Sequence, residues 1–238
     1  MEKYLHDYIG GAYMPIVRPK HVTDAESLIT RARIVDPDDR ERLLELAQEA
    51  EARPGAAVYE TRTIDSIEGD DVAIGDVTFH ARPLTRLFKS GMTVYPYVAT
   101  CGPDMAGYGD ALTDVLERYW WDLIMQGAVG YARNAMLDEI EKLAGYKPIS
   151  ANPGSIQMWP ISNQPALFSL IGNVDELIGV KVAPSFLMVP LKSVSGIFFQ
   201  GEGEGGFTHN CCLCERENCP GRKAPFDPAL KAALESDM

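Results

Sequence analysis

The sequence predicts an α+β fold, because segments that look like antiparallel strands occur together with clustered helical segments. The chain has 238 residues, of which 46% are hydrophobic, and this can fill the core of one large domain or two small ones. No clear domain boundary precedes Gly201. We therefore expect one domain over residues 1–200, and we expect residues 201–238 to form a glycine-rich link and a cysteine-containing tail packed on that domain.

The charge balance and the length of the apolar runs limit the partners of the chain. Asp and Glu number 34 against 22 Lys and Arg, which gives a formal net charge of −12. Nucleic acid phosphates would be repelled by such a chain, whereas a partner with a basic patch would be attracted. The first residues are polar, and no apolar run approaches the roughly 20 residues that span a bilayer. We expect a soluble, cytoplasmic protein without nucleic-acid or membrane partners.

Capping residues and periodic apolar positions predict five helical segments, and the first two open the fold. Asp24 can cap the first helix, and Asp36-Pro37 can start the second. The longest periodic segment follows Pro103, and Gly145 is a natural stop for it. The predicted helices cover residues 24–34, 38–52, 81–90, 104–144 and 164–172.

Runs of β-branched residues bounded by turn signals predict the strands. Residues 57–64 and 72–79 are separated by Glu68-Gly-Asp-Asp71, a pattern that is typical of a hairpin. A turn-rich loop over residues 147–160 follows the longest helix. Further strands are expected over residues 91–100, 180–190 and 192–200.

A cysteine cluster in the last quarter of the chain is its most informative chemical feature. Cys211, Cys214 and Cys219 form a Cys-x2-Cys-x4-Cys run with polar and charged flanks. Thiolates at this spacing repel one another unless they share a cation or become oxidised. In a reducing compartment close cysteines are more often ligands or redox groups than disulfides. We expect a metal centre, either a [4Fe–4S] cluster or Zn²⁺, with reduced free thiols as the alternative.

Three thiolates do not complete a tetrahedral site, so the fourth ligand stays open. Cys212 is adjacent to the first ligand, and neighbouring cysteines seldom bind one ion together. Cys101 lies between a predicted strand and a predicted helix, where a cysteine is more often a small core residue. We nevertheless hypothesise that Cys101 completes the site, with His209, Cys212 or an external group as alternatives.

A series of short segments follows one another in the order of a known family. The segments are Ala99–Pro103, the long helix after it, Asn152–Gly154, Trp159–Pro160 with Gln164, and Pro184–Ile197. Together they resemble the activation (reactivation) domain of cobalamin-dependent methionine synthase in its short stand-alone form. The resemblance covers most of the chain from about Ala57 onward, and the Met-x-Pro-x-Lys-Ser-x-Ser-Gly pattern is its most specific part. Stand-alone members similarly carry a Cys-x2-Cys-x4-Cys-x2-Arg tail, which here ends at Arg222.

This resemblance implies an α+β fold with a curved, mainly antiparallel sheet. It also implies work on corrinoids, in which cobalamin that has become inactive Co(II) is reduced and remethylated with S-adenosylmethionine. The chain has no Asp-x-His-x-x-Gly cobalamin loop, so the cobalamin would be held by a partner, a corrinoid protein or a cobalamin-dependent methyltransferase. The residues that the resemblance assigns to cofactor binding are Asn152, Pro153, Gly154, Trp159, Gln164, Lys192, Ser193 and Ser195.

The adenosylmethionine loop of that family reads Arg-x-x-x-Gly-Tyr or Arg-x-Ser-Pro-Gly-Tyr. Here Ser150 stands where the arginine is expected, and Ser155 where the tyrosine is expected. The charged group that would hold the methionine carboxylate is therefore missing from the loop. We expect S-adenosylmethionine to bind weakly or not at all.

The first functional interpretation is an accessory protein for reductive reactivation of a corrinoid methyltransferase system. In it, an iron–sulfur site at the tail cysteines relays single electrons, which Zn²⁺ cannot do. The second interpretation is a non-catalytic module, stapled by Zn²⁺, that docks on a corrinoid protein. The third is a methyl-transfer enzyme that binds S-adenosylmethionine through backbone contacts and acts on cobalamin. The sequence assigns no catalytic residue.

Overall fold

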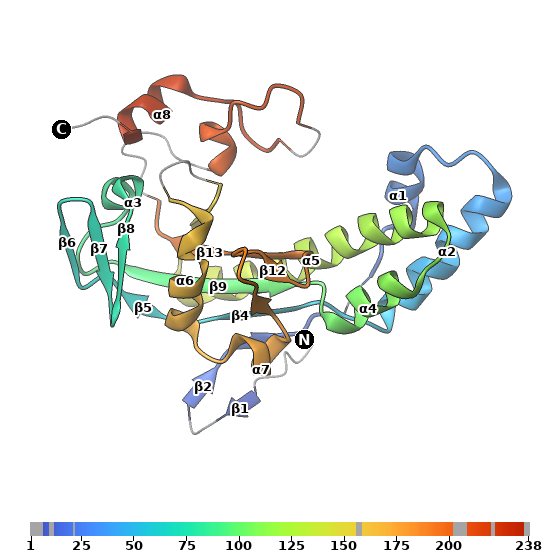
Figure 1. The fold of residues 1–238 in the computed structure, drawn as a ribbon, viewed down its shortest axis with the longest axis horizontal. Helices are drawn as coiled ribbons and strands as arrows, with labels where there is room; N and C mark the ends of the chain where they lie inside the picture. Colours follow the sequence, from blue (N-terminus) through green and yellow to red (C-terminus); the bar gives the residue numbers. More distant parts are fainter. Residues whose placement is uncertain are drawn as a thin grey trace.

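The molecule combines antiparallel sheets with clustered helices, so the α+β prediction is confirmed. A computed structural model of the protein describes residues 7–9, 12–20, 22–155, 159–201, 209–219 and 222–235. The strand pairs in these residues are all antiparallel, and the helices gather beside the central sheet instead of alternating with its strands (Figure 1).

A six-stranded sheet forms the middle of the fold. Its order is β10-β13-β9-β4-β3, and β5 also pairs with β9. The long strands β9 and β13 are rich in aromatic and β-branched residues, and they are buried along most of their length. The strands of this sheet are β3 (Ile16–Val17), β4 (Ala56–Tyr59), β5 (Arg62–Thr63), β9 (Thr93–Thr100), β10 (Ile149–Ala151) and β13 (Ser193–Phe199).

Three smaller sheets surround the central one. A three-stranded meander has the order β6-β7-β8, and two hairpins pair β1 with β2 and β11 with β12. Their strands are β1 (Asp7–Ile9), β2 (Ala12–Met14), β6 (Ser66–Glu68), β7 (Asp71–Ile74), β8 (Val77–His80), β11 (Lys181–Val182) and β12 (Met188–Val189).

The helices have the caps that the sequence indicates. Asp24 and Asp36 accept hydrogen bonds from the first turns of α1 and α2, and Gly145 ends α5 in the left-handed conformation. The helices are α1 (Ala25–Ala32), α2 (Pro37–Glu51), α3 (Arg82–Leu87), α4 (Pro103–Ala111), α5 (Val115–Ala144), α6 (Gln164–Ile171), α7 (Val174–Ile178) and α8 (Pro228–Glu235), with the short 3-10 helices η1 (Ile161–Asn163) and η2 (Asn210–Leu213).

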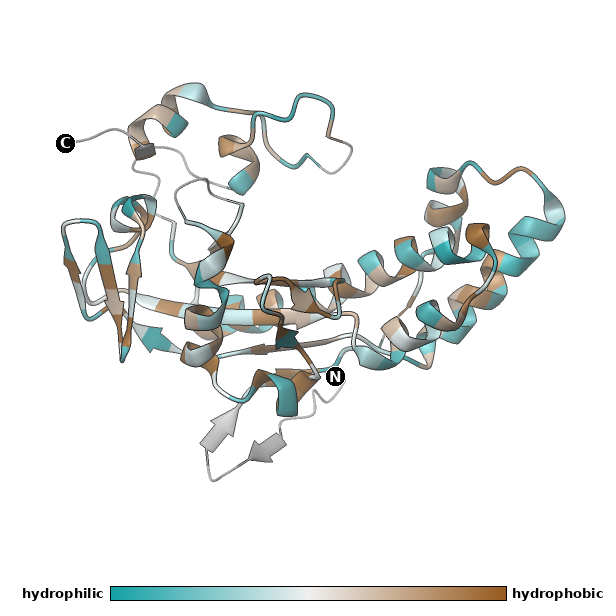
Figure 2. Cartoon of the chain, viewed as in Figure 1, coloured by the Kyte–Doolittle hydropathy of each residue, from teal (hydrophilic) through white to brown (hydrophobic). Residues whose placement is uncertain are grey.

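The long helix α5 belongs to two parts of the core. Its first half packs with α1, α2 and α4 in a helical arm, where Trp121 is fully buried. Its second half lies against the central sheet, where Ala132 and Met136 pack beside Tyr97 and Phe198. The buried positions recur every fourth residue from Ile124 to Ile140, which is more than one helical turn, so the buried stripe winds around α5 between the two parts. Figure 2 shows both hydrophobic and hydrophilic residues along this helix.

The tail packs on the opposite end of the molecule from the helical arm (Figure 1). Cys212 of η2 and Leu230 and Leu234 of α8 are buried in the core cluster that also holds Phe79 and Trp159. Helix α8 contacts both η2 and α3. Apolar packing therefore fixes the position of the described part of the tail.

The hairpin predicted from residues 57–64 and 72–79 is wrong. The first segment is β4, which is buried on both faces and pairs with β9 in the central sheet. The second segment folds on itself: β7 and β8 turn at Gly75, whose φ of 55° suits glycine. Two closely spaced turns, at Gly69 and Gly75, therefore make a meander where one turn was expected.

The segment predicted as one helix over residues 104–144 is two helices. Helix α4 ends before Leu112, and Asp114 then caps α5 by accepting hydrogen bonds from two backbone N–H groups. The break lets α4 fold back on α5, and the indole of Trp121 donates to the carbonyl of Met105 at 2.8 Å. Gly109 makes room for it, because a Cβ there would lie 2.5 Å from the Trp121 ring.

The strand expected over residues 180–190 is reduced to the short pair β11 and β12. Pro184 and Pro190 lack the N–H that a longer ladder needs, and Phe186 has a φ of 63° in the turn between the strands. Most of the predicted glycine-rich link, residues 202–208, lies outside the described residues. In the described part of the chain, none of the helices has the length and apolar character needed to cross a bilayer.

Candidate functional site

Asn152 is the centre of a buried hydrogen-bond network at the end of β10. Its Nδ2 donates to the hydroxyl of Tyr97 at 2.9 Å and to the carbonyl of Ser195. The hydroxyl of Ser150 donates to Asn152 Oδ1 at 3.1 Å, so the Tyr97 hydroxyl donates to Ser150, 2.9 Å away. Asn210 of the tail donates the second hydrogen bond to Asn152 Oδ1. The donors and acceptors of the Asn152 amide are thus all used inside the protein.

Gly196 permits this network, because β13 passes very close to Asn152. A Cβ at position 196 would lie 2.4 Å from Asn152 Nδ2 and 2.5 Å from the carbonyl oxygen of Ala151. The strands β9, β13 and β10 lie side by side, and Gly196 is paired with Tyr97. The Ser-Gly pair of the sequence pattern therefore brings one backbone carbonyl and the Asn152 amide into contact.

Two more of the predicted binding residues are joined beneath the same strands. Ser195 and Gln164 are each 3% exposed, and the Ser195 hydroxyl donates to Gln164 Oε1 at 2.7 Å. Gln164 is the first residue of α6, so this bond connects the start of α6 to β13. The Ser195 hydroxyl and Gln164 Oε1 are therefore paired with each other inside the protein.

The turn around Cys101 is hydrogen-bonded to the start of β13. Ser193 donates its one hydroxyl proton to the carbonyl of Pro190 at 2.7 Å, and its oxygen lies 2.9 Å from the hydroxyl of Thr100. The hydroxyl of Thr100 also accepts the N–H of Gly102, whose φ of 90° suits glycine. The first and last segments of the family-like pattern are therefore in direct contact, and Ser193 has a structural partner.

The loop after Asn152 places its tryptophan in the core. Trp159 is fully buried against Phe79, with ring centroids 5.7 Å apart, and its indole N–H has no hydrogen-bond partner among the described residues. Its carbonyl accepts the N–H of Gly154, which has a φ of 77°. Pro153 is buried and Gly154 is exposed, while residues 156–158 lie outside the described residues.

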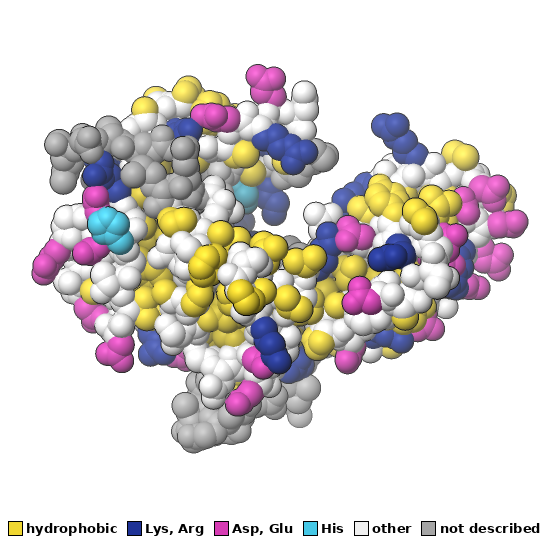
Figure 3. Space-filling model, in the orientation of Figure 1, with side chains coloured by type: hydrophobic (Ala, Val, Ile, Leu, Met, Phe, Trp, Pro, Cys, Tyr) yellow, Lys and Arg dark blue, Asp and Glu magenta, His cyan; other side chains and the backbone are white. Residues whose placement is uncertain are grey.

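A cleft of about 1060 Å³ lies between α4 and α5 on one side and the β11–β12 hairpin on the other. Lys192 lies in its wall and forms a 2.9 Å ion pair with Asp122 of α5, and Cys101 also lines the cleft. Leu187, Val189 and Leu191 line it with exposed apolar side chains, and Leu191 is 73% exposed. Figure 3 shows the hollowed face of the molecule, with apolar side chains on its floor and Lys and Arg at its edges.

The tail cysteines lie in a loop that Arg222 organises. Its guanidinium donates to the carbonyls of Cys211 at 3.1 Å, Cys214 at 3.0 Å and Ala224 at 3.2 Å, and also to that of Arg216. These hydrogen bonds explain the place of the arginine in the Cys-x2-Cys-x4-Cys-x2-Arg pattern, since one planar group binds four backbone carbonyls of the loop.

The individual cysteines differ in exposure and surroundings. All five are free thiols. Cys214 is exposed, Cys211 and Cys219 are half-buried, and Cys212 is buried. The sulfur of Cys211 accepts the N–H of Lys223 at 3.5 Å.

The structure does not bring the predicted metal ligands together. Among the described residues, no three His, Cys, Asp or Glu side chains form a group that could hold one metal ion. Cys101 lies in the core cluster of the helical arm, whereas the tail packs on the separate cluster that includes Cys212. Cys101 is therefore not beside the tail cysteines, because the tail docks on α3 and not on the Thr100–Gly102 turn. The metal centre at Cys211, Cys214 and Cys219 stays a prediction.

Arg133 of α5 and Asn210 of the tail are parts of the network that the sequence analysis missed. Arg133 donates from Nε to the Tyr97 hydroxyl at 3.3 Å, and its guanidinium lies 4.9 Å from the ring centre of Phe198. A sequence signal exists for the arginine, since it directly follows the core position Ala132 in a helix with a buried face. No sequence signal indicates Asn210, because its partner Asn152 is 58 residues away.

Comparisons with known proteins find likeness among solved structures. No protein-family profile matches the chain, and no curated protein matches it. Among solved structures, the chain is similar to one described as the MetH reactivation domain bound to AdoHcy, with 18% identity and a TM-score of 0.49. The alignment covers 74% of this chain, and this chain spans 65% of the length of the other.

Replacing Gly196 with alanine should destabilise the protein, because the new methyl group would collide with Asn152. Overpacking of this kind costs about 1–3 kcal/mol in the free energy of unfolding, which urea denaturation would measure. The matched control is Gly127→Ala in α5, where a Cβ meets no other atom within 4 Å. That variant should be stabilised by up to about 1 kcal/mol through helix propensity. Equal stability of Gly196→Ala and the unaltered protein would contradict the close approach.

Cys101 should be the least reactive thiol towards alkylation. Burial raises the pKa of Cys101 to about 11 from an ordinary value of 9.0. At pH 8 the thiolate fraction would be on the order of one in a thousand. Iodoacetamide should therefore modify the exposed Cys214 first, as measured by mass spectrometry over time, with the urea-unfolded chain as the control. The thiol of the unfolded chain ionises near pH 9, whereas the buried thiol of the folded chain stays protonated up to about pH 11. The free energy of unfolding should therefore fall as the pH rises from 9 toward 11. Equal rates for Cys101 and Cys214 would contradict this assignment.

Proposed function

We propose that the chain is an accessory protein that docks on a corrinoid-carrying protein and takes part in returning its cobalt from Co(II) to an active state. The observation that supports this function is the convergence of the family-like segments. Residues 99–103, 150–154, 164 and 192–196 are far apart in sequence, yet they are connected by hydrogen bonds, and Cys101, Pro103 and Lys192 among them line the cleft. Segments that serve one binding site are expected to lie together in the folded chain, as these family-like segments do.

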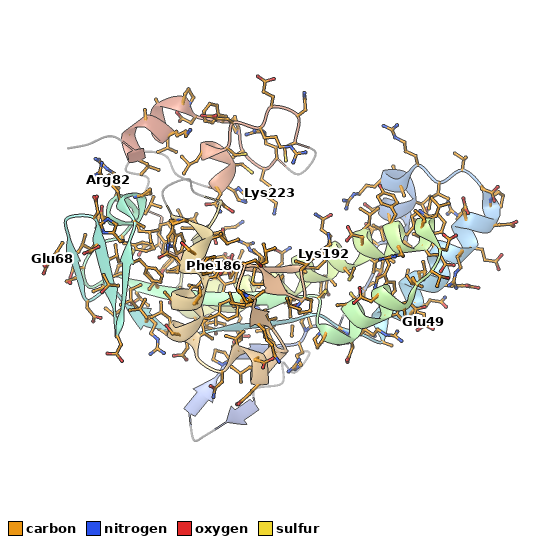
Figure 4. The ribbon with its side chains drawn as sticks, viewed as in Figure 1. Glu49, Glu68, Arg82, Phe186, Lys192 and Lys223 are labelled. Carbon is orange, nitrogen blue, oxygen red and sulfur yellow. The ribbon has the colours of Figure 1, made fainter. Side chains whose placement is uncertain are left out.

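The chemistry of the face fits a large ligand held by another protein. Leu187, Val189 and Leu191 are exposed beside the charged pair of Lys192 and Asp122. A contiguous apolar surface with polar groups at its edge is characteristic of interaction sites. A corrin ring has an apolar face and a periphery of amides, and the protein that carries it adds further surface to cover. Figure 4 shows Lys192 and Phe186 on this side of the molecule.

The interior network supports a docking role for the Asn152 region. The Asn152, Gln164 and Ser195 side chains are buried and hydrogen-bonded within the protein, so they shape the surface and leave direct contact to other groups. Ser150, at the position where the family has an arginine, is engaged by Tyr97 and Asn152 and offers no charge. This agrees with the expectation that S-adenosylmethionine is bound weakly through that loop.

The tail cysteines add the redox part of the proposal. An iron–sulfur cluster at Cys211, Cys214 and Cys219 would supply the single electron that reduces Co(II) to Co(I), whereas Zn²⁺ would leave the chain a docking module. The spacing of the cysteines and the Arg222-held backbone favour ligation. In the arrangement described above the three thiols do not converge, so cluster binding would require this loop to close around the metal.

Docking should depend on the apolar rim of the cleft. Replacing the exposed Leu191 with aspartate should weaken a complex with a Co(II) corrinoid protein by at least about tenfold, because a carboxylate would be desolvated in the interface. With a low-potential electron donor present, the Co(I) or methyl-Co(III) absorption band should form faster with the unaltered chain than without it. The matched control is Val35→Asp, since Val35 is 94% exposed in the helical arm. Absence of both a complex and a rate effect with corrinoid proteins of the same cell would remove this function.

Metal content should depend on three of the tail cysteines. Anaerobically purified protein should contain iron and sulfide, or zinc under the alternative, and Cys214→Ser should remove most of it. Cys212→Ser is the matched control, because Cys212 is buried among apolar side chains. A chain that docks normally but carries no metal would refute the electron relay and leave the docking function intact.

A further inference from the structure

The first turns of α5 expose an apolar stripe that the core does not use. Val115, Leu116 and Tyr119 are all exposed, and Val115 is 79% exposed. Positions three and four apart lie on one face of a helix, so Tyr119 adjoins both of the other side chains. Val115 is also the first residue of α5, where a β-branched side chain adds nothing to helix propensity. The stripe therefore suits contact with a partner better than it suits the fold itself.

The hairpin on the other side of the cleft carries a second apolar stripe. Side chains alternate between the two faces of a strand. Met188 of β12 accordingly packs on the core cluster that holds Leu177, while Leu187 and Val189 line the cleft and are exposed. Figure 3 shows apolar side chains in both places, on the floor of the hollow and on the helical arm.

The stripe on α5 continues into the wall of the cleft. Arg118 and Asp122 line the cleft, and they are three residues after Val115 and Tyr119. This spacing makes them neighbours of the apolar side chains on the helix surface. The two stripes are therefore the apolar edges of one cleft, and the 2.9 Å ion pair between Asp122 and Lys192 joins the walls between them.

The charges of the cleft balance, although the chain as a whole has a net charge of −12. Three acidic and three basic side chains line it. A neutral cleft does not repel an acidic segment of a partner, as most of this acidic chain would. Four of the six form ion pairs with one another, Lys192 with Asp122 at 2.9 Å and Lys181 with Asp175 at 3.3 Å.

Arg118 and Asp110 are the two charged side chains of the cleft that remain. Both are exposed, and neither forms an ion pair or a side-chain hydrogen bond within the described part of the chain. Gly109 lies against the Trp121 ring, and Arg118 precedes Trp121 by one turn, so both charges belong to the same part of the wall. A guanidinium offers five N–H donors, and arginine often dominates the energetics of interfaces. Arg118 is thus available for a carboxylate and Asp110 for an ammonium or guanidinium group.

The volume of the cleft corresponds to a short helix. A helical turn has a pitch of 5.4 Å and a diameter of about 10 Å, so it occupies on the order of 400 Å³. The cleft, of about 1060 Å³, therefore holds about two to three turns. An amphipathic helix presents a broad apolar stripe, and such helices bind grooves through residues spaced three and four apart.

We propose that the cleft binds an amphipathic α-helix of a protein partner, with an acidic side chain of that helix on Arg118 and a basic one on Asp110. Its apolar side chains would cover the stripes on α5 and on the hairpin, which removes both from water. The two opposite charges fix the direction of the helix in the cleft. This inference rests on the docking function proposed above, and it names the element of the partner that docks.

The test is selection, against the full chain, of helices from a phage-displayed helical scaffold with one randomised face. The enriched helices should carry apolar residues three and four apart, with Asp or Glu at the edge of the apolar face. For the best helix as a synthetic peptide, fluorescence anisotropy should show at least about tenfold weaker binding to Val115→Asp and to Arg118→Glu. An acidic residue at the start of a helix is favourable, so Val115→Asp should leave α5 folded.

The matched controls lie at the other end of the same helix. Leu143 is 62% exposed and Lys142 is exposed, so Leu143→Asp and Lys142→Glu make the same chemical changes away from the cleft. Both should leave the affinity of the peptide unchanged. Selection against Arg118→Glu should replace the acidic residue of the enriched helices with Lys or Arg, which a purely structural role of Arg118 would not cause.

The proposal is overturned by enriched helices without an acidic residue, by equal effects of Arg118→Glu and Lys142→Glu, or by the absence of any helix that binds below about 1 mM. No corrinoid is present in the selection, so its result is separate from the docking test at Leu191. A helix that binds the cleft while no corrinoid protein does would support this site and remove the corrinoid function. Corrinoid-protein docking that depends on Leu191 but not on Val115 or Arg118 would do the reverse.

Discussion

The close approach of β13 to Asn152 at Gly196 is the constraint on which the described site depends. With no side chain at position 196, the Asn152 amide can donate to the carbonyl of Ser195 and still close a ring of hydrogen bonds with Tyr97 and Ser150. Each such bond contributes only about 1 kcal/mol net, but a buried partner left alone costs more than that. The ring is therefore favourable only when all of its hydrogen bonds are formed. This requirement fixes the spacing of β9, β10 and β13.

The tail is joined to that ring from outside the sheet. Asn210 reaches the last acceptor position of Asn152, while Leu230 and Leu234 bury the helix α8 in the neighbouring core cluster. Arg222 then holds the cysteine loop by its carbonyls. Apolar packing, one amide contact and one arginine thus hold the described tail, and a bound metal would add a further support.

The sequence was informative where a signal is local. Caps at Asp24 and Asp36, and the left-handed glycine Gly145, mark helix ends because they act on the adjacent turn. The residues 57–64 were misassigned because β4 pairs with a strand some forty residues later, and short-range turn signals carry no information on that choice.

Some residues of the candidate site could be identified from the sequence and others could not. Asn152, Gln164 and Ser195 were identified through a sequence pattern, and their proximity is a property of the sheet register, which no single segment contains. Arg133 and Asn210 were missed because their partners come from other strands. Cys101 was assigned to the tail cysteines, yet the core of the helical arm encloses it, since the tail docks at the other end of the molecule.

Helix α5 gives the molecule a mechanical property that follows from its length. At 1.5 Å of rise per residue, its 30 residues form a rod about 45 Å long, anchored in the helical arm at one end and against the sheet at the other. Asp122 in the cleft wall and Arg133 beside the tail are on this one rod, about 16 Å apart. The wall of the cleft and the tail junction are therefore joined by one continuous helix, which sets the distance between them.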